Sequence, residues 1–140
     1  MDNPYAAPKA DVSEPDYTAA PLSWSQMLFS FEGRIRRGQY WLYAMGFSLV
    51  ASVALVALSF VLGLALPQGG QIAIIVLVGT LYLPMLYVLS ALQAKRWHDR
   101  GRSAWWMLVA LVPLANIWGL IEIGFLPGTP GRNEYGPPPR

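Results

Sequence analysis

Three long runs of apolar residues divide the chain, and short polar stretches separate them. The first run, residues 41–66, has 26 residues without a charge. As a helix it would be about 39 Å long, enough to cross a hydrocarbon core of roughly 30 Å. Residues 72–92 and 105–126 are also long enough for one crossing each. This pattern predicts an all-α fold, an integral membrane helical bundle with three transmembrane helices.

A short helix is predicted before the first run, over residues 23–32. Ser23 and Gln26 have the spacing of a capping box, in which each side chain caps the backbone of the other residue. The apolar residues that recur at helical spacing on one side are Trp24, Met27, Leu28 and Phe31. Such an amphipathic helix either lies at the membrane interface or packs on the other helices, and the pattern fits both.

Both ends of the chain differ in composition from the membrane domain, residues 23–126. Residues 1–22 are rich in Ala, Pro and acidic side chains and have no apolar periodicity, which predicts a disordered tail. They also lack the basic start and early apolar core of a cleaved secretory signal. Residues 127–140 are dense in Gly and Pro, so we expect turns followed by extended chain, with Tyr135 docked on the helix ends.

Prolines complicate the second and third runs. Pro84 cannot donate to the carbonyl of Thr80, which predicts a kink near mid-membrane. Pro113 and Asn116 allow residues 105–126 to form a re-entrant hairpin instead of a single crossing. We favour the single crossing, because the turn of a hairpin would leave backbone groups unpaired in lipid.

Basic residues predict the orientation of the chain. Arg34, Arg36 and Arg37 precede the first run and four more basic residues follow the second, whereas the turn at residues 67–71 has no charge. Basic residues concentrate on the cytoplasmic side, so both basic segments and the N-terminus are expected there. Three crossings would then place the C-terminus outside, and a hairpin would place it inside.

Composition agrees with a membrane protein and excludes several other classes. Apolar residues make up 54% of the 140 residues and charged residues 13%, with a mean hydropathy of +0.36, which is unusual for a soluble domain. The net charge of +2 is too small for a nucleic-acid-binding protein. With no cysteine and one histidine, the chain offers no disulfide or thiolate site, and we expect no metal or other cofactor.

Four polar residues stand out inside the apolar runs: Ser52, Tyr82, Asn116 and Glu122. The first three lie near the midpoints of their runs. We therefore expect them at similar depth, facing inward and hydrogen-bonded to one another or to the Thr80 carbonyl. Glu122 lies about four residues before the end of its run. An acid in a membrane can belong to a proton relay, but this near the interface we favour a structural role.

The most polar stretch, residues 95–103, is predicted to be a short aqueous loop between the second and third runs. His98 and Asp99 are an adjacent pair of catalytic residue types, but neighbours in sequence rarely converge on one target, and neither an activated nucleophile nor further metal ligands accompany them. We therefore expect no enzyme activity, and we expect Asp99 to pair with a nearby arginine. Candidate residues for binding anionic headgroups or a protein partner are Arg34, Arg36, Arg37, Lys95, Arg96, His98, Asp99, Arg100 and Arg102.

Three ordered motifs resemble a known family. They read Phe31-x-Gly33-Arg34-x-x-Arg37-x-x-Tyr40-Trp41, then Arg96-x-His98-Asp99-x-x-Arg102-Ser103-x-Trp105-Trp106, then Gly128-Thr129-x-Gly131-x-Asn133-x-Tyr135-Gly136-x-x-Pro139. Together, over about residues 24–139, they resemble the bacterial inner-membrane family called domain of unknown function 805. The resemblance implies a small multi-pass protein of the bacterial inner (plasma) membrane with no assigned activity, and it adds no catalytic residue.

The function expected is that of a scaffold or regulatory interaction protein, because the polar features lie in loops and tails, where docking usually occurs. The alternative is a component of a small oligomeric transporter or channel, with Tyr82, Asn116 or Glu122 lining a shared cavity. The expected partners are membrane lipids, with anionic headgroups at a basic cytoplasmic face, and a second copy or another membrane protein.

Overall fold

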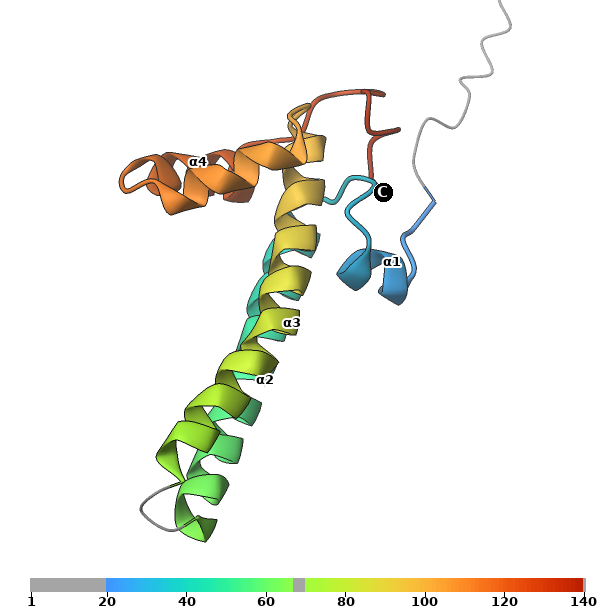
Figure 1. The fold of residues 1–140 in the computed structure, drawn as a ribbon. Helices are drawn as coiled ribbons and strands as arrows, with labels where there is room; N and C mark the ends of the chain where they lie inside the picture. Colours follow the sequence, from blue (N-terminus) through green and yellow to red (C-terminus); the bar gives the residue numbers. More distant parts are fainter. Residues whose placement is uncertain (1–19, 67–69, 140) are drawn as a thin grey trace, which may run out of the picture.

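Two long antiparallel helices form the body of the protein. The computed structural model describes residues 20–66 and 70–139, and this part of the chain is helical and contains no strand. Helices α2 (Arg37–Ala65) and α3 (Gln71–Asp99) have 29 residues each, about 43 Å at 1.5 Å per residue. Figure 1 shows them side by side as a hairpin. Both are long and apolar enough to cross a membrane.

The remaining elements gather at one end of this hairpin, which we call the polar end. It contains the start of α2, the last turns of α3, helix α1 (Trp24–Phe29), the 3₁₀-helix η1 (Ala104–Leu111), helix α4 (Ala115–Gly124) and the C-terminal tail, residues 127–139. In Figure 1, α4 projects to one side of α3 and α1 lies on the other. The buried core lies here too: Met27, Ile35, Tyr40, Val88, Leu92, Trp97 and Ile123.

Helix α1 begins with the predicted capping box. The Ser23 side chain accepts a hydrogen bond from the Gln26 backbone, and the Gln26 side chain accepts one from the Ser23 backbone at 3.0 Å. The helix packs on α3 and buries Met27. It ends at Phe29 rather than at residue 32, because Ser30 is extended and its hydroxyl accepts the Glu32 N–H. Most of the predicted disordered tail, residues 1–22, lies outside the described residues.

The expected third transmembrane helix over residues 105–126 is not formed, so a bundle of three crossings is not confirmed. Residues 112–114 break the segment into η1 and α4, which pack on each other. Val112 is extended, as the residue before a proline prefers, and Leu114 has a φ of +67°. The break falls within the region that the hairpin alternative indicated.

The turn at residues 112–114 pairs most of its own backbone groups, which weakens the objection to a hairpin. The N–H of Asn116 donates to the Val112 carbonyl at 3.0 Å, and the N–H of Ala115 donates to the Pro113 carbonyl at 2.8 Å. Pro113 has no N–H to satisfy. The cost that we assigned to unpaired groups at this turn is therefore small.

We expected residues 95–99 to belong to a loop. They form the last turns of α3 instead. The helix continues through Pro84 and past residue 92, and it ends only at Asp99. Lys95 and Arg96 are completely buried. The helix continues because these charged side chains find partners within the protein, as described below, instead of reaching water.

The expected hydrogen bonds among Ser52, Tyr82 and Asn116 are absent from the described residues. Asn116 lines a cavity together with Tyr40, which precedes Ser52 by 12 residues, about 18 Å along α2. Asn116 therefore lies at the polar end. Tyr82 is 44% exposed on the outer surface of α3, and Ser52 is exposed as well. The prediction was wrong because it placed Asn116 by counting along a crossing helix that does not exist.

Candidate functional site

The centre of the polar end is the carboxylate of Asp99, the last residue of α3. Arg34, just before α2, donates from Nε to Oδ1 at 3.0 Å, and its Nη2 lies 2.9 Å from the same oxygen. Arg96, one turn earlier on α3, donates from Nη1 to Oδ2. The side chains of both arginines are at most 1% exposed. The two basic segments that the sequence placed on one side of the membrane thus meet at one acid.

Arg34 also holds the C-terminal tail. Its Nη1 donates to the carbonyls of Gly131 at 2.8 Å and Gly136 at 3.1 Å, and its Nη2 donates to the carbonyl of Thr129 at 2.8 Å. In return, the Thr129 N–H donates to the Asp99 carbonyl at 2.8 Å. Every nitrogen of the Arg34 guanidinium therefore has a partner, and the tail is tied to the end of α3.

A second group of donors satisfies the C-terminal end of α4. The last carbonyls of a helix lack partners within it and carry the negative end of its dipole. Trp41 Nε1 donates to the Gly124 carbonyl at 2.9 Å, and Arg37 Nη1 donates to the Phe125 carbonyl at 2.7 Å. Arg96 donates to the carbonyls of residues 123 and 126, and Arg100 to that of residue 127. Side chains from α2 and α3 therefore hold the end of α4 in place.

Glu122 is an ion-pair partner of this basic cluster. Its Oε1 lies 2.7 Å from Nη2 of Arg100 and 3.6 Å from Nη2 of Arg102. The Arg102 guanidinium in turn lies over the rings of Trp106 and Trp118, at 4.6 Å and 5.4 Å from their centroids. This acid joins α4 to the end of α3 and to η1.

His98 and Lys95 are engaged with neighbouring segments. The His98 ring stacks on Tyr135 at 3.9 Å with an interplanar angle of 3°, and its Nδ1 lies 3.3 Å from the Gly33 carbonyl. Tyr135 thus docks on the helix ends, as the sequence predicted. Lys95 Nζ donates to the carbonyls of Met27, at 3.0 Å, and Ser30 at the end of α1. His98 and Asp99 face different partners and do not converge.

The candidate residues therefore fall into three groups. Arg34, Lys95, Arg96, His98 and Asp99 are buried and joined to protein groups, whereas Arg100 and Arg102 are partly exposed. Arg36 and Arg37 are exposed, and Nε of Arg36 donates to the Pro139 carbonyl at 3.2 Å. Within the described ranges, no group of three His, Asp or Glu side chains could hold a metal ion.

Sequence reasoning missed the acceptors of the basic cluster and one cavity whose mostly apolar lining includes three polar side chains. Most of the acceptors are backbone carbonyls at the ends of α1 and α4 and in the tail, which no side-chain pattern reveals. The cavity is lined by Tyr40, Gln93 and Asn116, among others. Gln93, the first polar residue after the predicted second span, was the one available signal for it.

An apolar helical hairpin with a buried ion-pair network at one end defines a small helical membrane protein. The chain belongs to the family described as "Protein of unknown function (DUF805)", whose model matches residues 28–137. This confirms the resemblance carried by the three motifs and the bacterial membrane character of the protein.

Relatives in Escherichia coli (strain K12) agree with this membership. The chain is 35% identical over 111 residues to "Inner membrane protein YhaH", covering 79% of this chain and 87% of that protein. It is 34% identical over 125 residues to "Inner membrane protein YhaI", covering 85% and 93%. It is 30% identical over 140 residues to "Uncharacterized protein YiiR", covering 82% and 89%. No solved structure matches the chain.

Proposed function

We propose that the protein crosses the inner membrane twice and acts by binding other proteins at its polar end, as a scaffold or regulatory subunit rather than as an enzyme. The observation that carries this proposal is the buried network around Asp99, whose charged groups are engaged with one another and with backbone carbonyls. A satisfied network of this kind stabilises one shape and specifies the arrangement of the segments around it. Its acid and its histidine face different partners, which argues against a shared role in proton transfer.

The outer surface of the polar end offers side chains suited to a protein partner. Trp24 and Phe29 on α1 are 71% and 58% exposed. Arg36 and Arg37, a few residues further along the chain, are exposed too. Aromatic residues and arginine are the side chains most enriched at the centres of protein interfaces. We therefore place the docking surface at α1 and the segment that follows it.

The same arrangement supports our proposal of a two-pass topology with both termini in the cytoplasm. Arg34 and the basic end of α3 lie together, so the positive-inside rule assigns a single side to the whole polar end. With α2 and α3 as the two crossings, the tail that contacts Asp99 lies on that side as well.

Single-cysteine labelling tests this topology, since the chain contains no cysteine of its own. We expect Ser25→Cys on α1 and Glu134→Cys on the tail to be protected from a membrane-impermeant maleimide added to intact spheroplasts. Gln71→Cys, exposed at the start of α3, should react. Reaction of Glu134→Cys from outside, with Ser25→Cys protected, would restore a third crossing and refute the two-pass topology.

Photo-crosslinking in living cells tests the interaction function. A photoreactive amino acid in place of Trp24 should give a discrete adduct with another protein. The same residue in place of Leu64, exposed at the opposite end of the hairpin, should react with lipid only. If neither Trp24 nor Phe29 yields a protein adduct, the proposed docking surface is wrong.

One observation favours the alternative, a component of a small oligomeric transporter or channel. Tyr82 and Thr80 lie exposed on the outer surface of α3, within its apolar part. A phenol facing hydrocarbon lacks a hydrogen-bond partner that a second copy of the chain would supply. In the same crosslinking experiment, an adduct of two copies formed from position 82 would favour this alternative.

A further inference from the structure

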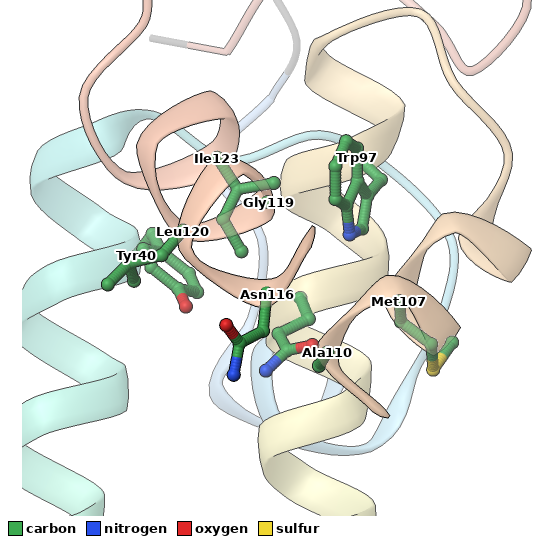
Figure 2. Close-up of a pocket in the computed structure, with 9 residues that line it drawn as sticks. Tyr40, Trp97, Met107, Ala110, Asn116, Gly119, Leu120 and Ile123 are labelled. Atoms are coloured by element: carbon green, nitrogen blue, oxygen red, sulfur yellow. The ribbon is translucent and has the colours of Figure 1, made fainter. Parts of the chain in front are cut away.

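A small cavity at the polar end has a lining unlike that of the ion-pair network. Figure 2 shows it between α2, α3, η1 and α4, with the Tyr40 hydroxyl and the Asn116 amide directed toward its interior. Its volume is about 120 Å³. The other lining residues include Gln93 and Trp97, and neither an acid nor a basic residue contributes. It is therefore a neutral, hydrogen-bonding pocket beside a strongly charged cluster.

The polar groups of this cavity have no partners among the described residues. Tyr40 is only 6% exposed, yet its hydroxyl forms no hydrogen bond to the part of the chain that the structure describes. Every fully buried side-chain nitrogen and oxygen of this part has a partner, so the hydroxyl is accessible from the cavity. Gln93, which is half-buried, and Asn116, which is exposed, also have side chains without a hydrogen bond to the described residues. A buried phenol normally has a hydrogen-bond partner. The Tyr40 hydroxyl therefore offers a hydrogen bond to a molecule in the cavity, and the neutral lining favours an uncharged group of that molecule at this level.

An apolar groove continues from the cavity along α2 and α3. Tyr40 and Gln93 line both, and the groove extends along Trp41, Ala44, Met45, Ser48 and Leu89 with a volume of about 380 Å³. These α2 residues recur at three- and four-residue spacing, so they form one stripe on the helix. Met45 is 63% exposed, which shows that the groove opens on the outer, apolar surface of the hairpin.

A cation lies at the polar end of the same stripe. Arg37 is one turn before Tyr40 and Trp41, is exposed, and is held in place by its hydrogen bond to the Phe125 carbonyl. Going down α2, the order is thus a cation, then neutral hydrogen-bonding groups, then an apolar groove. A glycerophospholipid has the complementary order: an anionic phosphate, ester carbonyls and an acyl chain.

We propose that the cavity and groove form a binding site for one glycerophospholipid of the surrounding leaflet. Its phosphate pairs with Arg37, an ester carbonyl accepts a hydrogen bond from Tyr40 or Gln93, and one acyl chain lies along Ala44, Met45 and Leu89. The lipid supplies a hydrogen-bond partner for the Tyr40 hydroxyl. This proposal goes beyond the proposed protein-binding function and does not depend on it, because Arg37 is the one residue that the lipid site shares with the proposed docking surface.

Titration of the delipidated full-length protein with phosphatidylglycerol, followed by native mass spectrometry, tests the site. We expect one lipid to remain bound at low lipid concentration. Tyr40→Phe should weaken binding up to about tenfold, the loss of one hydrogen bond in a dry site. Its melting temperature should be unchanged, because the hydroxyl forms no hydrogen bond to the described residues. Tyr82→Phe removes the same hydroxyl outside the groove and should bind like the unmodified chain.

A second pair of variants tests whether loss of lipid binding comes from blocking the groove or from placing a large side chain anywhere on α2. Ser48→Phe fills the groove and should abolish retention of the lipid. Gly46→Phe is the control: Gly46 lines a different groove of α2, and no atom lies within 4 Å of a Cβ added there. This variant should retain the lipid. Inorganic phosphate should not displace the lipid. The proposal is overturned if phosphate alone competes, if a neutral isoprenoid quinone is retained in preference to phosphatidylglycerol, or if Tyr40→Phe and Tyr82→Phe bind equally.

Discussion

Replacing Asp99 by asparagine is expected to lower the free energy of unfolding by about 3–5 kcal/mol, the usual cost of removing one partner from a buried ion pair. The side chains of Arg34 and Arg96 are almost completely buried, and Asp99 is the acid that faces both. An amide of the same shape retains one acceptor oxygen but leaves two buried guanidinium groups without a counter-charge. Equilibrium unfolding in bicelles measures the difference.

Glu134→Gln is the matched control for this substitution. It makes the same chemical change at an exposed acid of the tail, where a surface substitution should alter stability by no more than about 0.5 kcal/mol. Equal effects of the two substitutions, or a stability of Asp99→Asn within error of the unmodified protein, would contradict the central role of the Asp99 carboxylate.

Replacing Arg34 by lysine is expected to release the C-terminal tail and to destabilise the protein by about 2–4 kcal/mol, because each hydrogen bond from a charged donor contributes about 1.5–3 kcal/mol and the tail carbonyls are only part-buried. Lysine keeps the charge beside Asp99, but a single ammonium cannot reach the carbonyls of Thr129, Gly131 and Gly136 at once. Hydrogen exchange of the Thr129 N–H, which donates to the Asp99 carbonyl, should accelerate at least about tenfold, equivalent to about 1.4 kcal/mol.

Arg36→Lys provides the comparison. Arg36 is exposed and donates to one tail carbonyl, that of Pro139, so its replacement should leave the exchange of Thr129 unchanged. If Arg34→Lys leaves that exchange rate unchanged as well, the tail is held by contacts other than the Arg34 guanidinium, such as the stacking of Tyr135 on His98.

The three family motifs contact one another or the end of α4, and together they assemble the polar end. The first supplies Arg34, Arg37 and Trp41, the second supplies Arg96 and Asp99, and the third is the tail. Each donates to or accepts from another motif or the end of α4. The residues by which this chain resembles the family are therefore those that assemble its polar end.

The first glycine of the third motif, Gly128, is also required for the contact between the tail and Asp99. A Cβ at Gly128 would overlap the Asp99 carboxylate, so the tail reaches Asp99 only because this residue has no side chain. The motif includes Gly128, but the sequence does not show why a glycine is needed there. The structure explains it, because residues 99 and 128 lie in contact.

Local patterns were enough for the elements that need no distant partner. The capping box at Ser23 and Gln26 depends on residues three apart, and the long helices α2 and α3 depend on uninterrupted apolar composition. Charge placement also predicted that Arg34 and the basic end of α3 share one side of the membrane. Each of these signals acts within a few turns or through composition alone.

Tertiary structure decided how the third apolar run folds and where the charges of residues 95–99 lie. Hydropathy could not distinguish a crossing helix from the η1 and α4 hairpin, because both have the same apolar composition and the turn pairs most of its own backbone groups. Lys95 and Arg96 lie inside the protein because carbonyls at the ends of α1 and α4 accept their hydrogen bonds. A sequence pattern does not show which backbone carbonyls are free to accept a hydrogen bond. Only the packed fold therefore shows which charged side chains are buried and paired with such carbonyls.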